Sequence, residues 1–240
     1  MDTLRELLAR ERRSERVACR VGTDTRRYDY NDFLTTAWQS GNYLRHLGVR
    51  EGVAVGVADD PIPEALLAAL GAGLLGARAW FGPPAGADLR AIVAPAAEIE
   101  AYDARPGRKR VAYGGDAGDP AVGRFEEGIW SENPTMPPER PGSETAVLTD
   151  GDRTFPQREL LAAAADLGDE RGITAGTDVV IRAPLSDPRT VVGVLAALLA
   201  GGAVVCPETD EPDGDVAIGS GPEPTAIALD RITLLVSGDG

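Results

Sequence analysis

Residues 144–207 read ETAVLTDGDRTFPQRELLAAAADLGDERGITAGTDVVIRAPLSDPRTVVGVLAALLAGGAVVCP, and this stretch predicts the fold. Short apolar runs of β-favouring residues alternate in it with longer segments of helix-forming residues. The order strand, polar loop, helix, strand, helix, strand is typical of a parallel α/β unit. The polar loop after the first strand spans Thr149 to Thr154. It lies at the carboxyl end of a strand, where such folds place their chemistry.

The first half of the chain carries the same pattern about 125 residues earlier. Phe155–Leu161 corresponds to Tyr28–Leu34, where a helix begins. Gly172, which ends that helix, corresponds to Gly48. The repeat therefore predicts two similar α/β lobes rather than a solenoid.

The segment between the two halves has a different composition. Residues 114–142 are rich in Gly, Pro and acidic residues, which is typical of a connection. We therefore place the first lobe at 1–113, a connecting region at 114–143 and the second lobe at 144–240. Short strands at 215–218 and between 227 and 236 are expected to complete the second lobe.

The composition is strongly acidic. Against 24 Lys and Arg stand 38 Asp and Glu, which gives a formal net charge of −14. This charge argues against a nucleic-acid partner, because phosphate contacts need a basic face. Lys109 is the only lysine. Such a chain is similar to proteins of salt-loving organisms, whose acidic surfaces stay hydrated while salt screens their repulsion. A GC-rich codon bias is the alternative explanation for the missing lysine.

No segment indicates a membrane or a secretory route. Residues 1–16 lack the apolar core and the small-residue cleavage site of a signal peptide. The longest apolar run, residues 191–206, is interrupted by glycine and is too short to span a bilayer. It predicts a buried helix followed by a buried strand. We therefore expect a cytoplasmic protein with no membrane partner.

Few residues offer metal or nucleophilic chemistry. Cys19 and Cys206 lie far apart beside apolar residues, which predicts two buried thiols. His46 lies near the end of a predicted helix, where we expect a surface position. The sequence has no Cys/His cluster, no nucleophile elbow and no dinucleotide-binding glycine motif, so we expect no metal site and no catalytic residue of these kinds.

The glycines inside one predicted helix and the three tryptophans predict contacts between elements. Gly71 and Gly73 lie inside a predicted helix, where they favour close contact with a neighbouring element. Trp38, Trp80 and Trp130 are expected in the core or in an interface rather than around a ligand.

Several segments resemble the adenylate-forming enzymes, the family that includes acyl- and acetyl-CoA synthetases and peptide-synthetase adenylation domains. Tyr30–Phe33, Leu44–Val55 and Ala65–Ala77 are similar to the family's opening helix, its following glycine-rich turn and strand, and its alanine-rich helix. Thr145–Thr149 resembles the strand before the family's phosphate loop. The likeness covers most of the chain to about Pro207. It implies two flavodoxin-like α/β lobes with mostly parallel sheets, as in a shortened amino-terminal domain of these enzymes.

The loop itself departs from the family's signature, T-S-G-T-T-G-x-P-K-G. In that signature, glycines and hydroxyls wrap ATP phosphates and the lysine neutralises charge. Here LTDGDRTFP has one glycine and no lysine, and it brings two carboxylates. The candidate ligand-binding residues of this degenerate loop are Thr149, Gly151, Arg153 and Thr154. The family's Tyr-Gly-x-Thr-Glu adenine motif is absent as well.

These departures predict a truncated acyl-CoA synthetase-like protein that is not an enzyme. It would be a scaffold that binds a protein partner or a small acyl or nucleotide ligand, with no cofactor. The alternative is a component of an acyl-adenylate- or acyl-CoA-forming ligase that binds ATP with Mg²⁺, or an acyl adenylate, and is completed by another subunit. A folded gene remnant is the third possibility.

Overall fold

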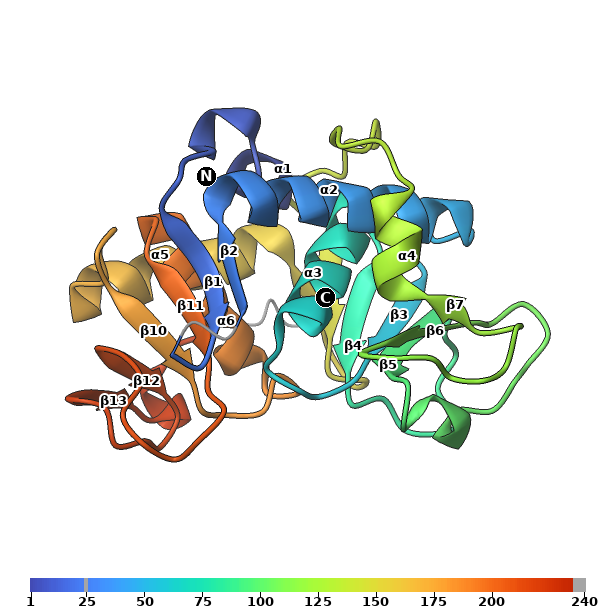
Figure 1. The fold of residues 1–240 in the computed structure, drawn as a ribbon. Coiled ribbons are helices and arrows are strands. Elements are labelled where there is room, and N and C mark those ends of the chain that lie inside the picture. Colours follow the sequence, from blue (N-terminus) through green and yellow to red (C-terminus); the bar gives the residue numbers. More distant parts are fainter. Residues whose placement is uncertain (24–25, 235–240) are drawn as a thin grey trace.

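The computed structural model describes residues 1–23 and 26–234 and contains two mostly parallel sheets with helices around them (Figure 1). Two copies of one strand–helix pattern make up most of it, as the sequence repeat predicts. The first copy comprises β1 (Val17–Val21), β2 (Arg26–Asp29), α2 (Tyr30–His46), β3 (Ala54–Val57), α3 (Pro63–Leu74) and β4 (Arg78–Phe81). The second copy comprises β8 (Ala146–Thr149), β9 (Thr154–Pro156), α5 (Gln157–Arg171), β10 (Asp178–Ile181), α6 (Pro188–Ala200) and β11 (Ala203–Cys206).

The other elements extend these copies. They are α1 (Leu4–Leu7), β5 (Ala91–Pro95), β6 (Lys109–Tyr113), β7 (Gly123–Arg124), α4 (Phe125–Trp130), β12 (Val216–Ile218) and β13 (Thr225–Ile227), with 3₁₀ turns at Arg10–Arg12, Ile99–Ala101 and Leu229–Arg231. Strands β3 and β11 are buried along their whole length, which follows from their continuous apolar sequence. The part of the last expected strand at 235–236 lies outside the described residues.

Five strands of one sheet and five of the other follow the same order: β5-β3-β4-β8-β9 corresponds to β12-β10-β11-β1-β2. Sheet I is β7-β6-β5-β3-β4-β8-β9, and sheet II is β13-β12-β10-β11-β1-β2. The hairpin β8–β9 of the second copy therefore lies in sheet I, where β8 pairs with β4 in parallel. The hairpin β1–β2 of the first copy lies in sheet II, where β1 pairs with β11 in parallel. The lobe boundaries at residues 113 and 144 stay a prediction. Each sheet contains strands from both sides of these boundaries.

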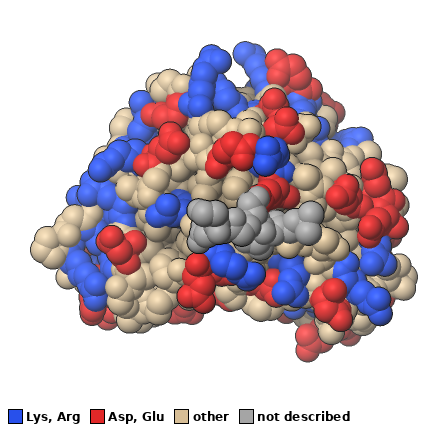
Figure 2. Space-filling view, turned by 180° about the vertical axis from the view of Figure 1, so that it is seen from behind, with Lys and Arg blue, Asp and Glu red and all other residues tan. Residues whose placement is uncertain are grey.

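Charged side chains help to hold the hairpin β1–β2 in place. Arg20 on β1 donates to Asp178 on β10 at 2.9 Å and to Asp213 before β12 at 2.8 Å. Arg26 on β2 pairs with Glu64 in the first turn of α3 at 2.7 Å. Acidic and basic side chains are interspersed over the face of the molecule seen in Figure 2.

Helix α3 is the central packing element. It contacts β3, β4, β5 and β8 of sheet I and β1 of sheet II, and it packs against α2, which runs across the top of Figure 1. Gly71 allows this approach, because a Cβ there would lie 2.7 Å from the backbone nitrogen of Gly41 in α2. Gly73 in turn faces the Leu4 side chain. The expectation that these glycines permit close packing is confirmed.

The connecting region contains more structure than its composition indicates. Helix α4 forms there and packs on α2, and its Phe125 is fully buried. Trp130 at the end of α4 is 84% exposed, so it does not pack in the core, and its place in an interface stays a prediction. Trp38 is buried and donates from Nε1 to the Leu8 carbonyl at 2.9 Å, whereas Trp80 is half-buried.

The approach of α2 and α3 gives a stability prediction. Gly71→Ala should lower the free energy of unfolding by about 1–3 kcal/mol, because the added methyl group meets backbone atoms that cannot move aside. Gly168→Ala in α5 is the matched control. No atom lies within 4 Å of its Cβ position, so it should raise the free energy of unfolding by about 0.5–1 kcal/mol. Urea unfolding followed by circular dichroism measures the free energy of unfolding of both variants. An equal increase in the two variants would contradict the close contact of α2 and α3 at Gly71.

Candidate functional site

The candidate loop is the turn of the β8–β9 hairpin. Thr149 and Thr154 face each other at its base, and Leu148 pairs with Phe155 one step below. Gly151 at the tip has a φ of 100°, and a Cβ there would lie 2.6 Å from the Trp80 ring. Backbone conformation and space therefore both require glycine at this position.

The backbone N–H groups of this turn are already bonded inside the turn. The Thr149 hydroxyl donates to the Arg153 carbonyl at 2.7 Å and accepts from the Gly151 N–H at 3.1 Å. The Asp150 Oδ1 accepts from the N–H groups of Asp152 at 3.1 Å and Arg153 at 2.8 Å. These are the groups that a phosphate loop offers to an anion. Here a carboxylate of the protein takes two of them.

The Arg153 guanidinium also pairs within the loop. Its Nε and Nη2 donate to Asp150 Oδ2 at 3.0 and 2.7 Å, and it lies 5.5 Å from the centre of the Phe155 ring. Burial raises the pKa of Asp150, but the hydrogen bonds from the Arg153 backbone and side chain outweigh it, so the pKa is lowered. Asp150 is therefore a stable carboxylate, with 17% of its side chain exposed.

The structure brings the four sequence-predicted residues, Thr149, Gly151, Arg153 and Thr154, into one turn. Three of them bond or pack within the loop, as described above. The Thr154 side chain is exposed and makes no hydrogen bond to any described residue. Sequence reasoning counted Asp150 as one of the two carboxylates of the loop but did not predict its bonds to the loop amides, which depend on its side-chain direction.

A cavity of about 360 Å³ lies between this loop and the N-terminus of α6. The N-cap of α6 is Asp187, whose Oδ1 accepts from the Arg189 N–H at 2.9 Å. The same oxygen lies 3.7 Å from Arg189 Nε. At this helix end too, a carboxylate of the protein stands where an anion would be favoured. The preceding Ser186 N–H donates to Asp59 of the other half at 2.8 Å, which fixes this wall.

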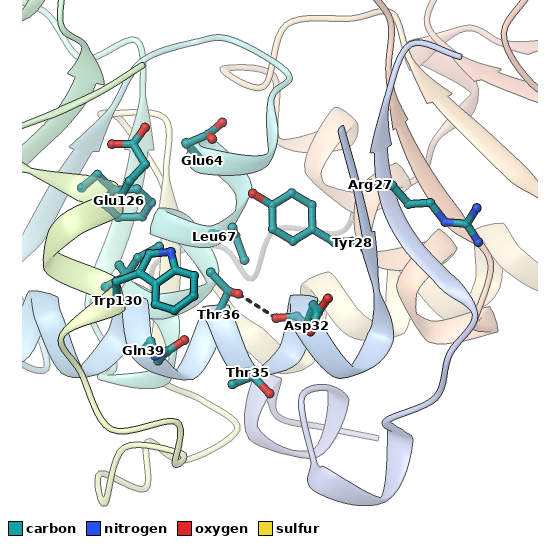
Figure 3. A pocket seen from close by; sticks show the side chains of 12 residues that line it. Arg27, Tyr28, Asp32, Thr35, Thr36, Gln39, Glu64, Leu67, Glu126 and Trp130 are labelled. Atoms are coloured by element: carbon teal, nitrogen blue, oxygen red, sulfur yellow. Dashed lines mark hydrogen bonds between the residues drawn. The ribbon is translucent and has the colours of Figure 1, made fainter. Parts of the chain in front are cut away.

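A second cavity, of about 420 Å³, lies between β2, α2, α3 and α4 (Figure 3). Tyr28 projects into it from β2, and Trp130 lies on the opposite wall (Figure 3). Sequence reasoning did not find this cavity, because its walls come from separate segments. An aromatic residue in a charged, Pro- and Gly-rich region, as Trp130 is, was the one local signal.

The remaining groups lie where the sequence predicts. Cys19 and Cys206 are free and buried on neighbouring strands, and Lys109 is exposed on β6. His46 is exposed, with Nδ1 2.7 Å from Glu132 Oε1. Within residues 1–23 and 26–234, no three His, Cys, Asp or Glu side chains are placed to hold a metal. None of the helices in this part of the chain has the length and apolar character needed to cross a membrane.

No protein-family model matches the chain, and no curated protein matches it. Solved structures do. A benzoate CoA ligase from Burkholderia xenovorans LB400 matches with a TM-score of 0.74 and 17% identity, over 90% of this chain and 50% of that chain. ATP-bound MatB from Rhodopseudomonas palustris matches with a TM-score of 0.73 and 16% identity, over 91% and 49%. The N-terminal domain of FACL13 from Mycobacterium tuberculosis matches with a TM-score of 0.71 and 16% identity, over 88% and 58%.

These matches confirm the α/β fold that the resemblance to adenylate-forming enzymes implies. The chain spans about half the length of the benzoate CoA ligase and of MatB. At these identities the likeness concerns the fold, and the chemistry of the loop has to be judged on its own residues.

The loop gives a prediction for Asp150. Asp150→Ala should lower the free energy of unfolding at neutral pH by about 1–2 kcal/mol, since it removes the acceptor of two backbone N–H groups and the partner of Arg153. Because the folded-state pKa of Asp150 is lowered, this difference is full above the ordinary carboxyl pKa of 3.8. It shrinks as the pH falls through the lowered value.

The control for this prediction is Asp152→Ala. The Asp152 side chain is exposed and makes no bond to the described residues, so its loss should change the free energy of unfolding by less than about 0.5 kcal/mol. Denaturant unfolding between neutral and acid pH measures both variants. Equal effects for the two, or an Asp150 effect that does not vary with pH, would contradict the assigned bonds.

Proposed function

We propose that this chain is a non-catalytic relative of the acyl-CoA ligases, which keeps the ligase scaffold and binds a small ligand or a protein partner without activating a carboxylate. One observation carries the proposal. The Asp150 carboxylate bonds the loop N–H groups that a ligase would offer to phosphate. No lysine lies in this loop, because Lys109 on β6 is the only one in the chain.

The energetics support the proposal. A phosphate that approaches the loop meets the charge of Asp150 in place of free donors. Two unit negative charges 4 Å apart repel by about 4 kcal/mol at an effective dielectric constant of 20. Arg153, which pairs with Asp150, offsets only part of this repulsion, and Asp187 occupies the neighbouring helix end. The residues present therefore do not fit the phosphates of ATP.

The alternative is a component of an acyl-adenylate-forming ligase. The likeness of its fold to MatB, a protein whose structure was solved with ATP bound, supports it. In that case a second subunit supplies the lysine and the rest of the nucleotide site, and ATP with Mg²⁺ or an acyl adenylate is the ligand.

The acid excess supports a further part of the proposal, a cytoplasmic protein that works at high salt. The isolated protein should therefore be tested in molar KCl, where its self-repulsion is screened.

Calorimetric titration with ATP·Mg tests the proposal. We expect no heat of binding at two temperatures, with or without acetate and octanoate, on protein that circular dichroism shows to be folded. The second temperature guards against an enthalpy that happens to be zero at the first. Binding with micromolar affinity would overturn the non-catalytic proposal. If that binding were lost in Arg153→Ala, it would assign the nucleotide to the loop and favour the ligase component.

A further inference from the structure

The cavity in Figure 3 is built from the first half of the chain and the connecting region. Its volume is about 420 Å³, within the range of small-molecule sites. Strand β2, an edge strand of sheet II, forms one wall, and α3 and α4 form the opposite wall. Helix α2 forms the floor. The cavity is separate from the loop at residues 149–154, which contributes no lining residue.

Most hydrogen-bond donors on the floor are already used. The Thr35 hydroxyl donates to the Asn31 carbonyl at 2.6 Å, and the Thr36 hydroxyl donates to the Asp32 carbonyl at 2.7 Å. One N–H of the Gln39 amide donates to the Glu132 carbonyl at 3.0 Å. For a ligand these side chains keep the lone pairs of two hydroxyl oxygens and one amide oxygen, and one amide N–H. Acceptors therefore outnumber donors on the floor, which favours a ligand that donates hydrogen bonds.

The charges around the cavity also favour a ligand that donates hydrogen bonds. Asp32, Glu64 and Glu126 line it. Arg26 pairs with Glu64 at 2.7 Å, and one oxygen of Glu126 accepts the Gly114 N–H at 2.7 Å. The other Glu126 oxygen and the Asp32 carboxylate have no hydrogen bond to the described residues. The one cation among the lining residues, Arg27, points away from the cavity (Figure 3).

Two aromatic rings complete the site. Tyr28 projects from β2 into the cavity, and Trp130 faces it from α4, with 84% of its surface exposed (Figure 3). The exposed Trp130 ring leaves its face open to a ligand. The face of an indole or phenol ring attracts a cation, and the attraction grows where nearby carboxylates add to the field.

We infer that this cavity binds a small organic cation, an alkyl- or arylalkyl-ammonium ion that carries N–H donors on an apolar body. The ammonium group bonds the free oxygen of Glu126, the apolar body lies between Tyr28 and Trp130, and Asp32 and the floor acceptors add to the attraction for a cation. The inference rests on the proposed function as a binding protein, and it names the class of ligand.

Three probes of one size and different charge test the inference: phenethylammonium, 2-phenylethanol and phenylacetate. Calorimetry and quenching of tryptophan fluorescence should show phenethylammonium binding at least about tenfold more tightly than the alcohol, with no binding of the carboxylate. Raising the KCl concentration should weaken the binding. Equal affinity for the ammonium ion and the alcohol, or no binding to folded protein, would overturn the inference.

Variants assign the binding to this cavity. Glu126→Gln and Trp130→Ala should each weaken phenethylammonium binding by about threefold to tenfold. Trp130 is exposed, so its loss leaves the core intact. The matched control is Glu127→Gln, the same charge change one residue along α4 at an exposed site outside the lining. Affinity that is unchanged in the first two variants, or that falls equally in the control, would overturn the assignment.

The ammonium experiment and the ATP titration test the two proposals independently. Absence of ammonium binding leaves the non-catalytic proposal in place, because the loop at residues 149–154 is not involved. Binding of ATP with micromolar affinity overturns that proposal whatever the ammonium probes show.

Discussion

The reciprocal pairing of β1 with β11 and of β8 with β4 is the constraint on which the rest of the structure depends. Each half of the sequence completes the other half's sheet, so neither sheet has all of its strands without both halves. One edge strand of each sheet, β2 in sheet II and β9 in sheet I, therefore comes from an exchanged hairpin. Each of the two cavities described above lies beside one of these edge strands. One is bounded by β2, α2, α3 and α4, and the other by the β8–β9 hairpin and the N-terminus of α6.

The two hairpins carry corresponding arginines that are satisfied in different ways. Arg26 reaches across to Glu64 in α3, whereas Arg153 turns back to Asp150 in its own loop. In the first case the arginine links the hairpin β1–β2 of sheet II to α3, beside an open, acidic cavity. In the second, the loop closes on itself and holds its own anion. One repeated scaffold thus gives one site suited to a cation and one loop whose backbone donors are bonded inside the loop, two of them to its own carboxylate.

The sequence predicted the parts that follow from local pattern. The apolar runs of β3 and β11 and the glycines that end helices locate the repeated α/β unit. The exchange of hairpins was not predictable, because it depends on pairing between strands far apart in the chain. Helix α4 was missed because it is short and lies among Pro and Gly. The candidate loop was located, but the role of Asp150 depends on which way its side chain turns.

The most direct test of the account is an NMR measurement of the Asp152 and Arg153 backbone amides, the two donors assigned to Asp150. Both resonances should titrate together, with a midpoint below the ordinary carboxyl pKa of 3.8. At neutral pH both should stay unchanged when inorganic phosphate or ATP·Mg is added to saturation. Resonances that do not follow a carboxyl titration, or that shift on addition of phosphate, would contradict a loop closed by its own carboxylate.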